Sequence, residues 1–153
     1  EIYTLSLHDA LPISGAPHRG STIHDLLGGL SDAGLSSVLF AQVEAEPSLQ
    51  TVENGRAALR EGDCDLVVAV GGGSAMDVGK AIGALAGTDE PISTFFSGAP
   101  TPGGGVPVIA LPTTSGTGAE VTPNSVLSNP ENGEKASIRG EGLLPEVAIV
   151  ENE

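Results

Sequence analysis

The sequence has few basic side chains, few aromatic residues and a single cysteine. Lys and Arg together number 6 in 153 residues, against 20 Asp and Glu, and the formal net charge is −14. Surfaces that bind nucleic acids or anionic membranes need clustered Lys and Arg, so we expect neither kind of partner. The one cysteine, Cys64, excludes an internal disulfide and a cysteine-rich metal site, and we expect it to be an inert core thiol. No apolar run approaches the ~20 residues of a membrane span, so we expect a cytoplasmic protein.

The first 13 residues do not have the pattern of a targeting segment. They lack the basic start and long apolar centre of a signal peptide, and they lack the arginines of a transit peptide. They do match the in-frame translation of a common sequencing adapter. We therefore interpret residues 1–13 as a non-native leader, with native sequence beginning near Ser14. The alternative is a genuine, weakly patterned segment.

Helix and strand patterns alternate along the rest of the chain, in which hydrophobic residues are frequent enough for a core (39% of the sequence). Capping residues and apolar spacing predict helices over residues 21–34, over residues 47–62 and from residue 74 onward. Short apolar runs predict strands over residues 38–40, 65–70, 106–111 and 143–150, with a long connection over residues 87–105. Residues 125–128 and 135–138 flank an Asn-Gly turn and predict a hairpin. The alternation predicts the α/β class, with a Rossmann-like, mainly parallel sheet, flanking helices and a β-hairpin appended at the edge of the sheet.

The first candidate binding loop joins the valine-rich strand to the third helix. Its three glycines, at positions 71–73, let the backbone approach a ligand closely, and free N–H groups at a helix start attract an anion such as a pyrophosphate. The loop also falls at the carboxyl end of a strand, where open α/β sheets bind their ligands. We expect the helix to begin at Ser74, which with Asp77 forms a capping pattern. A tight turn without a ligand, with Asp77 serving only as a helix cap, is the alternative.

The second candidate loop follows the next strand along the chain. Its threonines, Thr113, Thr114 and Thr117, offer hydroxyl groups that can bind phosphate and ribose without adding positive charge. Such chemistry suits a chain with so few bases. Taken by itself, the segment is better explained as a connector rich in Ser and Thr.

Together the two loops resemble the iron-containing (group III) alcohol dehydrogenase family. The resemblance rests on G-G-G-S-x-x-D-x-x-K over residues 71–80 and P-T-T-x-G-T-G-x-E-V-T over residues 112–122. It extends upstream to residues 46–55 and downstream to residues 144–149. Glycerol dehydrogenases and dehydroquinate synthases share the fold and a related glycine loop, but Ser74 and the threonine segment favour the alcohol dehydrogenase branch. The resemblance implies that residues 14–153 are a partial dinucleotide-binding domain and that the family's helical C-terminal domain is absent.

The resemblance also implies roles for residues of the first loop. Gly72, Gly73 and Ser74 would bind the pyrophosphate of the cofactor, and Asp77 would lie near its nicotinamide end. Lys80 belongs to the same motif, and we expect it at the surface of the helix.

Residues of the second loop and the hairpin would complete the cofactor site. Thr113, Thr114 and Thr117 would hold the adenine-side and phosphate groups, and Lys135 would reach the nicotinamide ribose. An exposed hairpin lysine without a ligand is an equal alternative for Lys135. Glu120 we expect to position its own loop.

One further position bears on the choice between NAD and NADP. Family members that use NAD carry an acid at the end of the strand before the first helix, where it bonds both ribose hydroxyls. Gly15 stands in that place here, and Arg19 would supply a positive charge to a 2′-phosphate. We therefore expect an NAD(P) cofactor, with NADP favoured.

The resemblance implies an activity for the whole protein, which we expect to be an NAD(P)-dependent, metal-assisted alcohol dehydrogenase or aldehyde reductase. A divalent metal, Fe or Zn, would polarise the oxygen of a small alcohol or aldehyde during hydride transfer. Its family ligands, one Asp and three His, map onto no residue here, so we predict no catalytic or metal-binding residue in this chain. We expect a homodimer for the full-length protein, and for this fragment weak dinucleotide binding without turnover. A non-catalytic nucleotide-binding module and an enzyme of the glycerol dehydrogenase or dehydroquinate synthase type remain as alternatives.

Overall fold

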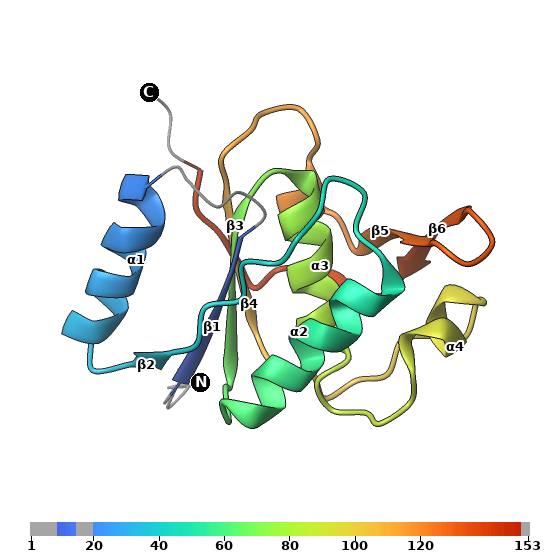
Figure 1. The fold of residues 1–153 in the computed structure, drawn as a ribbon, viewed down its shortest axis with the longest axis horizontal. Helices are drawn as coiled ribbons and strands as arrows, with labels where there is room; N and C mark the ends of the chain where they lie inside the picture. The colour runs from blue at the N-terminus through green and yellow to red at the C-terminus, as the bar shows by residue number, and fades with distance from the viewer. Residues whose placement is uncertain (1–8, 15–19, 151–153) are drawn as a thin grey trace.

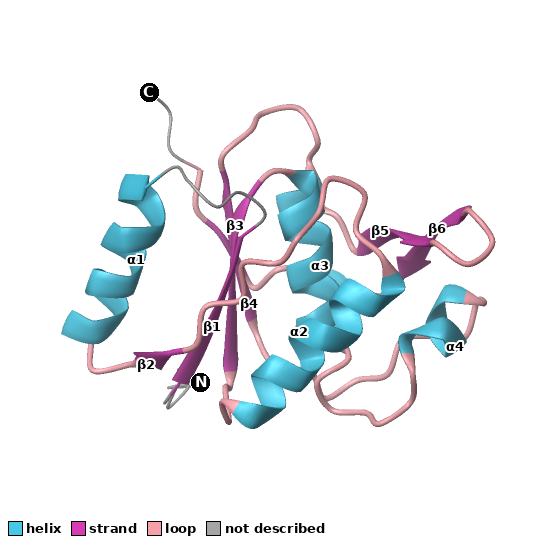
Figure 2. Cartoon of the chain, viewed as in Figure 1, coloured by secondary structure: helices cyan, strands magenta, loops and turns pink. Residues whose placement is uncertain are grey.

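Strands and helices alternate in the computed structural model, which describes residues 9–14 and 20–150 (Figure 1). The strands are β1 (Asp9–Ser14), β2 (Ser36–Ser37), β3 (Leu66–Gly71), β4 (Val108–Pro112), β5 (Asn124–Asn129), β6 (Glu134–Arg139) and β7 (Val147–Ala148). The helices are α1 (Gly20–Asp32), α2 (Leu49–Glu61), α3 (Gly73–Ala84) and α4 (Ile92–Phe96), with 3-10 turns η1 (Ala119–Val121) and η2 (Glu141–Leu143). Figure 2 shows how these elements are distributed.

A parallel sheet separates two layers of helices. Five strands of the described residues lie in the order β2-β1-β3-β4-β7, and neighbouring strands in this order pair parallel. Helix α1 covers one face of the sheet, and α2 and α3 cover the other (Figure 1). The predicted Rossmann-like α/β class is therefore confirmed.

Strand β3 lies at the centre of the sheet and has the composition that this place requires. Its first five residues are all buried, because both of its faces are covered by helices. Leu66, Val68 and Val70 pack with the apolar stripe of α1, while Val67 and Ala69 face the opposite layer. Continuous apolar sequence, rather than alternation, is thus the correct signal for this strand.

Strand β1 is formed by residues that we interpret as non-native. It lies between β2 and β3 and pairs with β3 from Ala10 to Ser14. Ala10, Leu11 and Ile13 have no exposed surface. Small and apolar side chains at these positions fit the middle of the sheet, whatever their origin, so the interpretation of residues 1–13 stays a prediction. Gly15 and Arg19 lie outside the described residues.

Three peripheral predictions are corrected by the structure. The strand expected over residues 143–150 is reduced to Val147–Ala148, and Leu143 belongs to the 3-10 turn η2 instead. The strand expected over residues 38–40 is displaced to Ser36–Ser37, with Phe40 reduced to a bridge to Ile13. The connection expected over residues 87–105 contains the short helix α4. Its apolar side chains Ile92 and Phe95 are buried, which explains why this segment is helical despite its flanking Gly and Pro residues.

The predicted hairpin exists, but it does not extend the main sheet. Strands β5 and β6 pair antiparallel and form a two-stranded sheet of their own. Strand β5 packs beside α3, and Ser128 also bridges to Ser48 at the start of α2 (Figure 2). The edge position next to β4 is taken by β7 instead.

Helix α3 lies unusually close to β3. Nine of its 12 residues are buried. A Cβ atom added at Gly79 would lie only 2.7 Å from the Cβ of Ala69, so the absent side chain is what permits this approach. The chain runs directly from the end of β3 at Gly71 into the start of α3 at Gly73.

Helix α2 begins at a hydrogen-bonded cap. The Ser48 hydroxyl accepts from the Thr51 backbone N–H at 3.2 Å. The Glu44 carboxylate accepts from the Ser48 N–H at 2.9 Å and from the Thr51 hydroxyl at 2.6 Å. Burial works to raise the pKa of Glu44, but the hydrogen bonds from Thr51 and Ser48 outweigh it and hold the pKa below its ordinary value.

We predict that Gly79→Ala destabilises the fold by about 1–3 kcal/mol, because a methyl group there overpacks the contact with Ala69. Gly28→Ala is the matched control, since nothing lies within 4 Å of that helical position. It should stabilise the chain by about 0.5–1 kcal/mol through helix propensity. Urea unfolding of both variants measures the two effects, and equal effects of the same sign would contradict the packing argument.

We also predict that Glu44→Gln lowers the free energy of unfolding at neutral pH by less than about 1 kcal/mol, because the site is exposed. A carboxylate with a lowered pKa stabilises the fold above its ordinary pKa of 4.5, and this contribution disappears as the pH falls through the lowered value. The difference between wild type and variant should therefore vanish in acid. Urea unfolding of both proteins at neutral and at acidic pH checks this, and a difference independent of pH would refute it.

Candidate dinucleotide-binding site

The two predicted loops lie side by side because they leave neighbouring strands at the same level. Strands β3 and β4 are parallel, and their last residues, Gly71 and Pro112, are partners in the register. The Thr113 N–H donates to the Gly71 carbonyl at 2.8 Å, which ties the start of the second loop to the first. Both loops lie at the carboxyl edge of the sheet, at the top of the view in Figure 1.

The glycine loop presents backbone rather than side chains to its neighbour. Gly71 has φ +141°, a conformation that other residues rarely adopt. A Cβ at Gly72 would lie 3.3 Å from the Oγ1 of Thr114, and one at Gly73 would lie 3.2 Å from the Cγ2 of Thr117. The two loops therefore approach each other directly, with the glycines on one side and the threonine side chains on the other.

The start of α3 differs slightly from the expectation. The helix begins at Gly73, and Gly72 is its N-cap, so Ser74 lies inside the first turn instead of capping it. A glycine cap offers no side-chain hydrogen bond. Amide groups at such a helix start are suited to an anion, and the helix dipole favours a negative charge there.

The hydroxyl group of Ser74 already has a partner. It donates to the backbone carbonyl of Ala45 at 2.7 Å, which joins the first turn of α3 to the segment before α2. The hydroxyl proton of Ser74 is therefore engaged within the protein.

The three predicted threonines lie on the exposed rim of the second loop. Thr113, Thr114 and Thr117 are all exposed. The Thr117 hydroxyl accepts from the Ala119 N–H at 3.4 Å, where the loop turns into η1. These side chains are accessible to a ligand that enters between the loops.

Asp77 connects α3 to the hairpin. One carboxylate oxygen accepts from the Val126 N–H at 3.1 Å, and the other lies 3.1 Å from the Nζ of Lys80. The Ser125 hydroxyl donates to the Asp77 backbone carbonyl at 2.8 Å. The side chain thus has a structural role in this conformation, and its predicted place near the nicotinamide stays a prediction.

Lys80 is not at the helix surface as expected. Its side chain is 1% exposed, and Nζ donates to the backbone carbonyls of Ala119 at 2.9 Å and Thr122 at 3.3 Å. Burial lowers the pKa of Lys80, and the charges of Asp77 and Glu120 oppose that shift. A sequence signal was present, because residues 75–86 are almost all small or apolar and leave the helix no polar face.

Lys135 lies on β6 with its side chain 56% exposed. Its Nζ donates to a carboxylate oxygen of Glu46 at 3.3 Å. Glu46 is the neighbour of Ala45, which accepts from Ser74, so one short segment contacts both the hairpin and the first turn of α3. The reach of Lys135 to a ribose stays a prediction.

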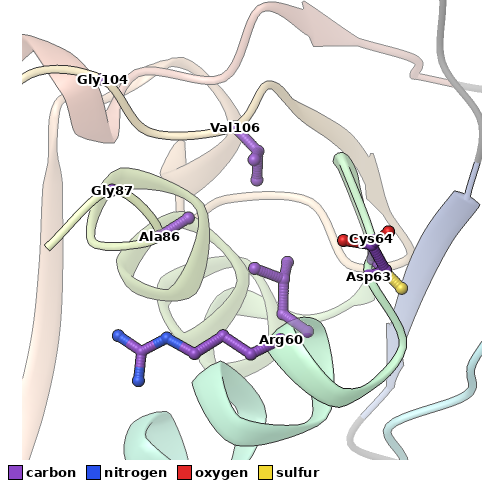
Figure 3. A pocket seen from close by; sticks show the side chains of 8 residues that line it. Arg60, Asp63, Cys64, Ala86, Gly87, Gly104 and Val106 are labelled. Atoms are coloured by element: carbon purple, nitrogen blue, oxygen red, sulfur yellow. The ribbon is translucent and has the colours of Figure 1, made fainter. Parts of the chain in front are cut away.

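A separate shallow cavity of about 270 Å³ lies at the opposite end of the sheet (Figure 3). Cys64 and Val106, which precede β3 and β4, are among its lining residues, as are Arg60 and Asp63. It is remote from both loops, so it is not the predicted site. Cys64 is buried, and burial raises the pKa of its thiol. Nearby negative charges raise it further, as expected for an inert core cysteine.

Within residues 9–14 and 20–150, no group of three or more His, Cys, Asp and Glu side chains is placed to hold a metal ion. None of the helices described is long and apolar enough to cross a membrane. His24 is exposed and lies 3.7 Å from the carboxylate of its neighbour Asp25.

Comparison with known proteins gives consistent matches. Among curated proteins, the chain is 40% identical over 132 residues to the 1,3-propanediol dehydrogenase of Klebsiella pneumoniae, covering 86% of this chain and 34% of that protein. It is 33% identical over 124 residues to the sulfoacetaldehyde reductase of Bilophila wadsworthia, covering 81% and 32%. The chain thus spans about a third of the length of these relatives.

A solved structure shares the fold. The sulfoacetaldehyde reductase of Bifidobacterium kashiwanohense, crystallised with NAD+, superposes with a TM-score of 0.86 at 40% identity, covering 94% of this chain and 38% of that one. The family model for iron-containing alcohol dehydrogenases matches residues 4–152. That match includes both motif loops, which the fold brings together at one edge of the sheet. The chain therefore belongs to the iron-containing alcohol dehydrogenase family.

Proposed function

We propose that this chain binds a nicotinamide dinucleotide between the loops that follow β3 and β4, within an NAD(P)-dependent alcohol dehydrogenase or aldehyde reductase. The observation that carries the proposal is the direct approach of the glycine backbone at Gly72 and Gly73 to Thr114 and Thr117, beside a helix start that has no side-chain cap. A diphosphate group fits this chemistry because backbone N–H groups and hydroxyls are available on both sides.

The donors of this site are neutral, in keeping with a chain that carries 6 basic residues. The backbone N–H groups of Gly72, Gly73 and Ser74 would hold the diphosphate, assisted by the dipole of α3. The hydroxyls of Thr113 and Thr114 would bond phosphate or ribose oxygens. When bound, the nicotinamide ring supplies the carbon that accepts or gives a hydride.

Relatives support the activity proposed for the whole protein. Their names include an NAD-dependent methanol dehydrogenase and 1,3-propanediol dehydrogenases, and one reductase structure contains NAD+. A small alcohol or aldehyde is therefore the substrate class that we propose. Assistance by Fe or Zn, a homodimer and a cytoplasmic location are further proposals for the whole protein. The described residues do not fit a metal, so we derive no step through one.

We predict that the 153-residue chain binds NADH weakly, with a dissociation constant on the order of 0.1–1 mM. Gly73→Val should weaken binding by roughly tenfold or more, because the added side chain would crowd Thr117 and displace the two loops from each other. Titration of NADH fluorescence measures both, and the same chain with NAD+ and an alcohol should form no NADH.

Gly103→Val is the matched control for this experiment, because nothing lies within 4 Å of that loop position. Its affinity for NADH should equal that of the wild type. Absence of NADH binding by the wild type, or equal affinities of the two valine variants, would refute the proposed site. Turnover by the isolated chain would refute only the prediction that it is inactive.

We further predict that NADPH binds more tightly than NADH, by roughly three- to tenfold, because Gly15 replaces the acid that would repel a 2′-phosphate. Arg19→Ala should reduce the affinity for NADPH and leave that for NADH unchanged. Parallel fluorescence titrations with the two cofactors check this. Equal affinities in the wild type would contradict the preference for NADP while leaving the site itself intact.

A further inference from the structure

Lys80 joins α3 to the end of the second loop. Its Nζ donates to the backbone carbonyls of Ala119 and Thr122, at the two ends of the turn that closes the loop, and lies 3.1 Å from the carboxylate of Asp77. All of these partners belong to the protein, and the side chain is 1% exposed. Lys80 is therefore placed to organise the loop and not to touch a ligand.

A buried ammonium group is costly, since it must give up its hydration. The helix positions around Lys80 are small or apolar, so an apolar side chain would suit the core at less cost. What an apolar side chain could not do is donate to two carbonyls of a loop that lies 39 and 42 residues further along the chain. The specific consequence of Lys80 is thus the fixed position of this loop.

The same helix carries both sides of the proposed site. Its first turn contains Gly73, and Lys80 follows about two turns later. The near end of the second loop is held by the bond from the Thr113 N–H to the Gly71 carbonyl, and its far end is held by Lys80. The threonines between these two attachments are therefore held at a set distance from the glycine loop.

Asp77 extends this arrangement to the hairpin. Its carboxylate accepts from the Val126 N–H with one oxygen and pairs with Lys80 through the other. The chain that leaves the second loop is thereby fixed to α3 at the start of β5 as well. The negative charge of Glu120 also acts on Lys80 and, like that of Asp77, opposes the lowering of its pKa by burial.

We propose that Lys80 is a positioning residue, which fixes the loop over residues 113–122 to α3 and so sets the spacing between the threonines and the glycine loop. This inference rests on the proposed dinucleotide site. Lys80 acts through the loop and makes no contact with the cofactor.

Arg56 provides a matched control. It is also a buried cation, 2% exposed, and it pairs with an acid three residues earlier, Glu53, at 3.0 Å. Its guanidinium donates to the backbone carbonyls of Leu85, Thr88 and Glu90. Those carbonyls lie beyond the C-terminal end of α3, away from both loops. Arg56→Met therefore removes a buried cation of the same kind without touching the site.

The test is amide hydrogen exchange in the 153-residue chain without cofactor, comparing wild type with Lys80→Met and Arg56→Met. The informative amides are those of Thr113, Ala119 and Val121, which are hydrogen-bonded within or at the start of the loop. Relative to the amides of β3, their exchange should accelerate by about tenfold or more in Lys80→Met and change by less than about twofold in Arg56→Met. Unchanged exchange in Lys80→Met, or equal acceleration in both variants, would overturn the proposal.

Cofactor affinity gives the second readout. Lys80→Met should weaken NADH binding by about tenfold, Arg56→Met should leave it within about twofold, and Lys80→Arg should recover most of the loss because it retains a buried donor. Equal losses for the two methionine variants would mean that Lys80 has only a structural role. If the wild type binds no dinucleotide, the proposed function fails, while the exchange experiment still decides whether Lys80 orders the loop.

If circular dichroism shows that Lys80→Met does not fold, Asp77→Asn replaces it in the hydrogen-exchange experiment. An amide at this position keeps an oxygen that can accept from the Val126 N–H, while its NH2 group replaces the carboxylate oxygen that pairs with Lys80, so the Lys80 pairing is lost. The same three loop amides should exchange faster in this variant. Exchange equal to that of the wild type would overturn the proposal.

Discussion

The parallel pairing of β3 with β4 is the constraint on which the site depends. Because Gly71 and Pro112 are partners in the register, the loops that follow them must begin at the same edge of the sheet. The missing side chain at Gly79 lets α3 lie directly on β3, and the first turn of the helix is thereby placed beside the second loop. A tightly packed core thus sets the positions of two exposed loops.

Basic side chains have different roles at the surface and in the interior of this structure. At the surface, the proposed site offers neutral donors, and backbone amides and a helix dipole would attract a diphosphate there without basic side chains. In the interior, Lys80 and Arg56 are each buried, and each bonds to backbone carbonyls of a distant segment. An acidic chain with 6 basic residues therefore places two of them where they join segments far apart in the sequence.

The sequence predicts the local elements well because most of them are decided by local chemistry. The helix predicted over residues 47–62, the valine-rich strand β3 and the hairpin turn are found close to where they are expected, and the two motif loops do meet. The tertiary arrangement of these elements is less predictable from the sequence. Periodicity alone does not say which strand takes the sheet edge, so the hairpin was misplaced. It also does not say that α3 is buried on all sides, so Lys80 was expected in solvent.

We propose that the dinucleotide binds at the carboxyl edge of the sheet and not in the cavity at its other end. The most direct measurement is a titration of the isotope-labelled chain with NADH, followed by the backbone amide shifts in two-dimensional NMR. We predict that the amides of Gly72, Gly73 and Thr114 move, while those of Cys64 and Gly104 at the cavity stay fixed. Shifts confined to the cavity, or no shifts at saturating NADH, would contradict the account.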